Sequence, residues 1–220
     1  MTVQAVTFDV GGTLISVWPS VGEVYADVAA NHGLPGLNPG ELARRFGAAW
    51  SRRANFGYRR HEWEAIVDEI FAGLAPERPS RTFFDALYRR FDEPECWRIH
   101  SDVVEVLEAL RERGVRLGLI SNWDDRLRPL LTRLDLARWF EVIVISCEAG
   151  WVKPDRRIFE TAAHAFWLQP GAILHVGDCL SEDVAGARAA GFRALLLDRA
   201  GQVAQPGVIL HLSSVTEHLR

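Results

Sequence analysis

The chain has 220 residues, of which 48% are hydrophobic and 25% charged, which is the composition of a globular protein and excludes a disordered, collagenous or coiled-coil chain. Its 29 acidic residues outnumber its 25 basic ones, for a formal net charge of -4 without a basic stripe, so no nucleic-acid partner is expected. The three cysteines form no CxxC pair, no stretch is apolar over the roughly 18 residues that cross a bilayer, and the N-terminus has no basic leader. We therefore expect a cytoplasmic protein without a membrane partner, and the composition leaves its oligomeric state open.

The first predicted element is a short buried strand over residues 3–9, which ends at Asp9 and runs into a tight turn at Gly11 and Gly12. From about residue 20 to 92 the hydrophobic residues recur at helical spacing, in four groups that turn-forming residues separate. These groups predict four amphipathic helices, which bury their apolar faces by packing as a small bundle.

Beyond Trp97 the pattern changes to alternating helices and strands. Strands are predicted at 115–120, 142–146, 172–177, 193–198 and near 208–210, and helices at 102–113, 124–134, 155–167, 182–190 and from about 214. Apolar strands that alternate with helices of this length are typical of a parallel sheet covered on both faces. The predicted fold class is therefore α/β: a Rossmann-like core of residues 1–15 and 99–220, interrupted by an inserted all-α domain, a four-helix bundle of residues 16–98.

Polar residues follow the ends of the predicted parallel strands, where the functional crevice of such a sheet lies. They stand at or just beyond four strand ends: Asp9, Ser121 with Asn122, Lys153, and Asp178 with Asp183. Taken singly, such residues are more often helix caps or turn residues. Because the strands are parallel, however, the sequence predicts that all of them converge on one pocket.

Lys153 stands out within this set, because it is the only lysine among the 25 basic residues and all the others are arginines. A compact ammonium and a planar guanidinium suit different arrangements of hydrogen-bond acceptors. We therefore expect Lys153 to lie near Asp9 and Asp178, where it would compensate adjacent carboxylates. A surface lysine retained by chance is the alternative that the residue count leaves open.

The predicted cluster has the chemistry of a phosphoryl-transfer site. Clustered carboxylates repel one another unless a cation lies among them, and oxygen ligands favour Mg²⁺. Lys153 and the metal ion would share a dianionic group, whose remaining oxygens Ser121 and backbone amides would hold. Asp9 would then attack the phosphorus to form an aspartyl-phosphate that water hydrolyses.

Four segments resemble, in the same order, the four motifs of the haloacid dehalogenase-like (HAD) hydrolase superfamily: Asp9-x-Gly-Gly-Thr13-Leu14, Ile120-Ser121-Asn122, Lys153-Pro154-Asp155 and Gly177-Asp178-x₄-Asp183. The helical insertion is similar to the C1 cap of that superfamily. The opening motif looks closest to the subgroup called haloacid dehalogenase-like hydrolase domain-containing protein 3. The resemblance implies that Asp9 is the nucleophile and that Lys153 binds the phosphoryl group. It further implies that Thr13, Ser121 and Asn122 contact the substrate. The implied Mg²⁺ site consists of Asp9, Gly11, Asp178 and Asp183.

Gly11 departs from the pattern of the family's phosphatases, which usually carry there a second aspartate that protonates the leaving group and activates water. That general acid–base role is typically worth about 10²–10⁴ in rate. Phosphonatases also lack the aspartate but use a cap lysine, and residues 16–98 contain no lysine. The resemblance also speaks against the metal-free haloacid dehalogenases, which usually lack the metal-binding pair Gly177-Asp178.

The sequence therefore predicts a Mg²⁺-dependent phosphatase that acts on a small phosphorylated metabolite through Asp9. Two alternatives stay open at this point. One is a phospho-ligand-binding or regulatory protein of the same fold without efficient turnover, and the other is a haloacid dehalogenase.

Overall fold

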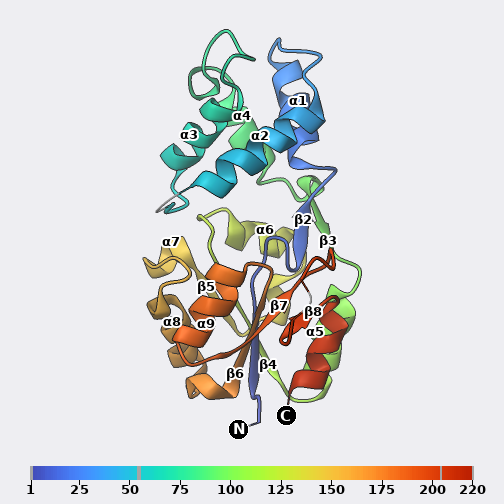
Figure 1. Ribbon diagram of the computed structural model, residues 1–220, viewed down its shortest axis with the longest axis vertical. Helices are drawn as coiled ribbons and strands as arrows, with labels where there is room; N and C mark the ends of the chain where they lie inside the picture. Colours follow the sequence, from blue (N-terminus) through green and yellow to red (C-terminus); the bar gives the residue numbers. More distant parts are fainter. Residues whose placement is uncertain (1, 54–55, 204, 220) are drawn as a thin grey trace. The chain divides into compact units, whose positions relative to one another are not determined.

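The computed structural model describes residues 2–53, 56–203 and 205–219, and the chain divides into two compact units. One unit comprises residues 1–16 and 99–220, and the other comprises residues 17–98. The first unit holds a six-stranded sheet and the second is helical (Figure 1). Where the chain passes between the units, two short strands pair with each other, β2 (Ile15–Val17) and β3 (Trp97–Ile99).

The sheet of the first unit has the strand order β5-β4-β1-β6-β7-β8, and its neighbouring strands are parallel. Its strands are β1 (Ala5–Phe8), β4 (Arg116–Ser121), β5 (Val142–Ile145), β6 (Ile173–Gly177), β7 (Arg193–Leu197) and β8 (Val208–Ile209). In the central strand β1, Phe8 is paired with Leu119 of β4 and with Val176 of β6. The strand order reverses at β1, and in open α/β sheets ligands bind at the carboxyl edge of such a switch point.

Helices cover both faces of this sheet (Figure 1). They are α5 (Val103–Glu112), α6 (Leu127–Arg133), α7 (Ser146–Ala149), α8 (Arg156–Phe166), the π-helical turn η5 (Leu180–Ala185), α9 (Gly186–Ala189) and the 3₁₀ helix η6 (Leu212–His218). On one face, Phe159 and Phe166 of α8 lie in a buried cluster with Ile120 and Ile173 of the sheet. On the other face lie α5 and η6, which also pack against each other. The predicted α/β fold class is therefore confirmed.

The helical unit contains α1 (Val21–Asn31), α2 (Pro39–Arg52), α3 (Arg60–Ile70) and α4 (Phe84–Arg90). The first of these begins at a side-chain cap, where Ser20 Oγ accepts the N–H of Glu23. The apolar faces of the helices meet in a core rich in aromatic rings, in which the Tyr25 ring lies 5.9 Å from the rings of Phe71 and Phe91. Four helices thus occupy the segments in which hydrophobic residues recur at helical spacing.

The structure differs from the sequence-based expectation at its shortest elements. Strands β2 and β3 are not predicted, because three residues are too few to show a hydrophobic period. The predicted helix at 182–190 begins earlier, as η5, and the predicted C-terminal helix is the 3₁₀ helix η6. Among the described residues, no helix combines the length and the apolar character that crossing a bilayer requires.

Candidate active site

Asp9 lies at the carboxyl edge of the sheet, directly after the central strand β1. It is 7% exposed, and its N–H donates to the carbonyl of Val176 at 2.9 Å. Its Oδ1 accepts two hydrogen bonds, one from Ser121 Oγ at 3.1 Å and one from Lys153 Nζ at 2.6 Å. Ser121 ends the neighbouring strand β4, so the parallel pairing of β1 with β4 delivers both side chains to the same place.

Lys153 is buried, and its ammonium also donates to Oδ1 of Asp183 at 2.6 Å. Burial opposes its charge, but the carboxylates of Asp183 and Asp9 outweigh that cost and raise the pKa of Lys153 above its ordinary value. The expected neighbours of the ammonium are Asp9 and Asp178, whereas the carboxylates that accept its hydrogen bonds are Asp9 and Asp183. The single lysine of the chain therefore bridges two buried carboxylates.

The carboxylates of Asp9, Asp178 and Asp183 form a cluster in which one oxygen of each lies within 4.8 Å of the others. Burial raises the pKa of Asp9, and the charge of Asp183 adds to the rise while Lys153 opposes it. Asp178 stands at the exposed edge of the cluster, where partial desolvation and the charges of Asp9 and Asp183 raise its pKa to about 7. The single ammonium of Lys153 does not neutralise all three carboxylates. The cluster therefore keeps excess negative charge, which a divalent cation would balance.

The carboxylates of Asp178 and Asp183 each lie against the backbone at a glycine. A Cβ atom on Gly12 would lie 2.3 Å from Asp178 Oδ2, and Gly12 has a φ of 79°, which residues with a side chain rarely adopt. A Cβ atom on Gly177 would lie 2.2 Å from Cγ of Asp183. The positions of both acids therefore require glycine at these sites.

Two residues that the sequence assigned to substrate contact hold other site residues in place. Asn122 is buried, and its Oδ1 accepts the N–H of Lys153 at 2.7 Å. Its Nδ2 donates to the carbonyl of Lys153 at 3.0 Å and to Oε2 of Glu182 at 3.0 Å. The buried Thr13 donates from Oγ1 to Asp178 Oδ1 at 3.4 Å. The contacts in the structure thus position Lys153 and Asp178.

Gly11 lies against the indole ring of Trp123. A Cβ atom at position 11 would be 3.2 Å from Cζ3 of that ring, although the φ of Gly11 is outside the left-handed region. The backbone of Trp123 is anchored by Ser146, whose Oγ accepts the N–H of Trp123 at 3.0 Å and donates to its carbonyl at 3.0 Å. The position at which the family's phosphatases carry a second aspartate is therefore bounded by an apolar ring.

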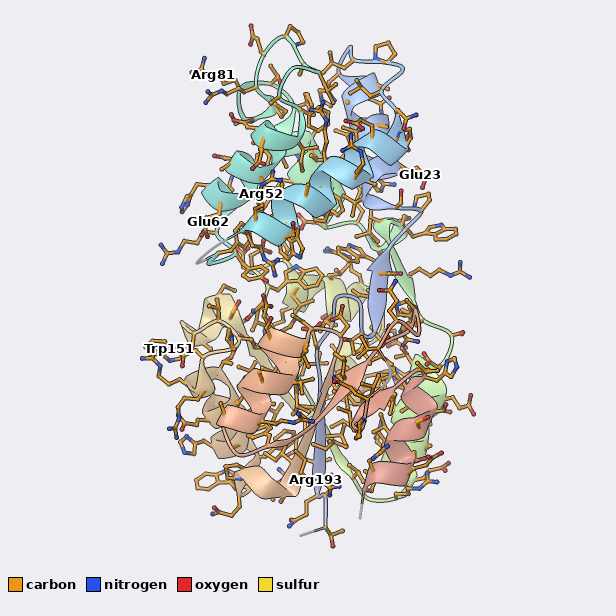
Figure 2. All side chains as sticks on the ribbon, viewed as in Figure 1. Glu23, Arg52, Glu62, Arg81, Trp151 and Arg193 are labelled. Atoms are coloured by element: carbon orange, nitrogen blue, oxygen red, sulfur yellow. The ribbon has the colours of Figure 1, made fainter. Side chains whose placement is uncertain are left out.

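Lys153 is buried, whereas Trp151, two residues before it in the same loop, points outward (Figure 2). Trp151 is 38% exposed, and the guanidinium of Arg157 lies 3.3 Å from its ring centroid. Asp155 caps α8 by accepting the N–H of Arg157 on Oδ1 at 2.9 Å. The loop is thus held on its outer side by α8 and on its inner side by Asn122.

Sequence reasoning gave no role in the site to three polar residues near it, although it placed one of them, His175, at a core position with its polar atoms satisfied. Ser146 anchors Trp123, and the fully buried Thr7 and His175 form a hydrogen-bonded pair that reaches Asp183. The available signal was a polar residue within an otherwise apolar strand, which needs a partner when it is buried. The partner itself lies on another strand, and a hydrophobicity pattern carries no information about it.

Residues 3–191 match the family model of haloacid dehalogenase-like hydrolases. The chain belongs to this family. The protein is similar to haloacid dehalogenase-like hydrolase domain-containing protein 3 of Homo sapiens, with 33% identity over 208 residues that cover 90% of this chain and 82% of the relative. The resemblance seen in the four motifs is therefore confirmed.

Phosphatases are among the relatives of this HAD-family hydrolase. Phosphoserine phosphatase from Thermus thermophilus is 36% identical over 153 residues, which cover 69% of this chain and 57% of that protein. The HAD-hydrolase YfnB from Bacillus subtilis, solved bound to magnesium, shares the fold with a TM-score of 0.78 at 16% identity and covers 100% of both chains. Solved structures with the same fold carry the names of a HAD phosphatase and of a 2-haloacid dehalogenase, so the fold alone does not select the reaction.

Replacing Lys153 by methionine is expected to destabilise the folded protein, because Asp9 and Asp183 would lose the cation between them. Removal of one partner from a buried ion pair typically costs about 3–5 kcal/mol. Urea unfolding followed by circular dichroism measures the free energy of unfolding. The matched control is Arg156→Met on α8, because its pair with Glu160 is exposed, with side-chain exposures of 66% and 33%, and should contribute about 1 kcal/mol or less. Equal stability of the two variants would contradict the role given to the ammonium.

Proposed function

We propose that the protein is a Mg²⁺-dependent phosphatase, which transfers the phosphoryl group of a small phosphorylated metabolite to Asp9 and then to water. The observation that carries the proposal is the arrangement around Asp9, a buried carboxylate whose Oδ1 accepts hydrogen bonds from Ser121 and Lys153 beside two further carboxylates. Two donors on one oxygen orient the carboxylate, so that Oδ2 attacks. The phosphatase among the curated relatives supports the same reaction.

Mg²⁺ is the cation that suits this group of ligands. The cluster offers carboxylate oxygens, and Mg²⁺ keeps several waters and so needs few protein ligands. Asp9, Asp178 and the backbone carbonyl of Gly11 would hold the ion, with Asp183 next to them. When bound, the ion supplies positive charge that stabilises the oxygens of the phosphoryl group. The relative solved bound to magnesium, which shares this fold, is consistent with this choice.

The proposed reaction has two steps, in which Asp9 and Lys153 have separate roles. In the first step Oδ2 of Asp9 forms a bond to phosphorus, and the bond from phosphorus to the leaving oxygen breaks with its electron pair on that oxygen. An ammonium has three N–H groups, of which Lys153 directs two at Asp9 and Asp183, and we assign the third to a phosphoryl oxygen. In the second step water attacks the phosphorus, inorganic phosphate leaves, and the carboxylate of Asp9 re-forms.

The leaving oxygen has no acid at position 11. Gly11 has no side chain to protonate it, and a Cβ atom at this position would lie 3.2 Å from Cζ3 of Trp123. The leaving oxygen therefore departs with its negative charge, which favours leaving groups that are stable as anions. The preferred substrates are accordingly acyl and aryl phosphates rather than sugar phosphates.

The contact between Gly11 and Trp123 also favours a second candidate function, a protein that binds a phosphorylated ligand without efficient turnover. In that case the anion-binding groups would serve recognition alone. Dehalogenation is the weaker alternative, because attack on carbon gives no role to the carboxylates of Asp178 and Asp183 beside Asp9.

The first test is the dependence of rate on the leaving group, measured with Mg²⁺ on a series of acyl, aryl and alkyl phosphates. We expect kcat/KM to rise steadily as the pKa of the leaving group falls, because the leaving oxygen is not protonated. The isosteric Asp9→Asn variant serves as the blank and should lose turnover while it still binds phosphorylated ligands. Equal rates across the series would mean that another residue supplies the proton. Ligand binding by calorimetry without turnover in the natural protein would instead favour the second candidate function.

The second test is the pH dependence of stabilisation by Mg²⁺. The pKa of Asp178 is about 7, against an ordinary value of 3.8. Between these two pH values the folded protein keeps a proton that the unfolded chain has lost. The metal-free protein therefore loses stability as pH rises from about 3.8 to about 7. The ion must displace that proton at pH 6 but hardly at pH 8, so its apparent affinity should be about tenfold weaker at pH 6. The rise in Tm with Mg²⁺ concentration measures both affinities. Asp178→Asn should weaken Mg²⁺ binding and remove the pH dependence, and an unchanged Tm response in that variant would contradict the site.

The third test restores the missing acid. Gly11→Asp alone should give little, because its Cβ would stand 3.2 Å from the Trp123 ring, which must shift to admit a side chain. Combined with Trp123→Ala, which opens the space, it should raise turnover of alkyl phosphates by up to about 10²–10⁴-fold. Kinetics of both single variants and the double variant form a double-mutant cycle. If Gly11→Asp alone reaches the full gain, the indole ring does not block this position.

A further inference from the structure

Two polar side chains face each other beneath the site, in the interior of the sheet. Thr7 of β1 and His175 of β6 are register partners on adjacent strands, and both are 0% exposed. Oγ1 of Thr7 and Nδ1 of His175 are 2.9 Å apart, and the other ring nitrogen, Nε2, lies 3.2 Å from Oδ1 of Asp183. The histidine therefore links the centre of the sheet to the carboxylate that holds Lys153.

Both oxygens of Asp183 face groups that can only donate, since Lys153 Nζ donates to Oδ1 and the N–H of Cys179 donates to Oδ2. The third group in contact with this carboxylate is Nε2 of His175, which donates to Oδ1. The hydroxyl of Thr7 and Nδ1 of His175 form the remaining hydrogen bond of the chain.

Asp183 is held from three sides by these contacts. Its Oδ1 accepts from His175 and from Lys153, and its Oδ2 accepts the N–H of Cys179 at 3.0 Å. The histidine ring is fixed in turn by Phe159 of α8, whose ring meets it edge-on with centroids 5.3 Å apart. A displacement of the ring would therefore move Asp183 and, with it, the ammonium that reaches Asp9.

We propose that His175 is a positioning residue, which, oriented by the Thr7 hydroxyl, holds Asp183 so that Lys153 stays in contact with the nucleophile Asp9. The inference rests on the proposed function in that Lys153 contacts the phosphoryl group. Packing alone does not account for the pair, because apolar side chains of similar volume fill a buried site at least as well as polar ones. The chain Thr7–His175–Asp183–Lys153 instead joins the sheet to the ammonium that contacts Asp9, and a displacement of about 1 Å at a reacting group can cost about 10²-fold in rate.

The single lysine makes this proposal measurable without reference to activity. Protein labelled with [ε-¹³C]lysine should give one Cε–Hε cross-peak, which belongs to Lys153. Thr7→Val keeps the shape of the side chain and removes the hydroxyl, and the matched control Thr7→Ser keeps the hydroxyl. His175→Phe keeps a ring and removes both nitrogens. All spectra are recorded on the full chain, with and without Mg²⁺.

We expect Thr7→Ser to retain the natural cross-peak and kcat. Thr7→Val and His175→Phe should shift the cross-peak and lower kcat on aryl phosphates by about 10- to 100-fold, with a smaller change in KM. A merely structural role would lower Tm in these variants and leave both the cross-peak and kcat unchanged, which would overturn the proposal. Should His175→Phe fail to fold, Thr7→Val alone carries the test.

The two proposals fail in different ways. If the natural protein turns over no phosphate ester while the cross-peak shifts in Thr7→Val and stays in place in Thr7→Ser, the positioning of Lys153 by His175 stands and the phosphatase proposal fails. If phosphatase activity is present and equal in all variants with an unmoved cross-peak, the phosphatase proposal stands and the role of His175 is refuted.

Discussion

The buried ammonium of Lys153 is the interaction on which the rest of the site depends. Parallel strands bring Asp9 to the carboxyl edge of the sheet, and the turn after β6 and the helical turn η5 bring Asp178 and Asp183 to the same place. Three carboxylates at this separation repel one another in a partly desolvated setting. Lys153 compensates two of them directly, with contacts of 2.6 Å to each. The loop that carries it is correspondingly fixed, since Asn122 binds both the N–H and the carbonyl of Lys153.

The arginines of the chain show why this one position differs. A guanidinium is a planar fork that suits two acceptors side by side. Arg199 uses it in this way, with contacts of 3.0 Å to both oxygens of Asp102 and 2.9 Å to the carbonyl of Thr13, in the turn after β1. Burial raises the pKa of Asp102, but Arg199 and the N–H of Leu212 outweigh it and lower that pKa below its ordinary value. At Lys153 the acceptors belong to separate carboxylates that converge on one point, and a compact ammonium meets that geometry.

The residues at the strand ends could be predicted from the sequence, but the hydrogen-bond partners of the site residues could not. Asp9 directly follows one mostly apolar strand and Ser121 ends another, and a parallel sheet places such ends at one edge, so their proximity follows from the topology. The direction of the Asn122 amide follows from loop conformation, which a residue pattern does not encode. The pairing of Thr7 with His175 joins residues 168 positions apart, and its basis is the order of the strands in the sheet. Sequence patterns thus specify which residues reach the site edge, while the hydrogen bonds that orient them depend on packing.

The relation between Gly11 and Trp123 bears on how the absence of the second aspartate is understood. A chain that had lost catalysis by drift would be expected to lose residues that bind the metal ion or the phosphoryl group at random. Asp9, Ser121 and Lys153 are nevertheless all present and in contact. The empty position at Gly11 is instead matched by a ring that lies against it, and Ser146 anchors the backbone of that ring on both its N–H and its carbonyl. In the proposed reaction, the lack of an acid–base side chain at position 11 would slow both the departure of a poor leaving group and the hydrolysis of a phosphorylated Asp9.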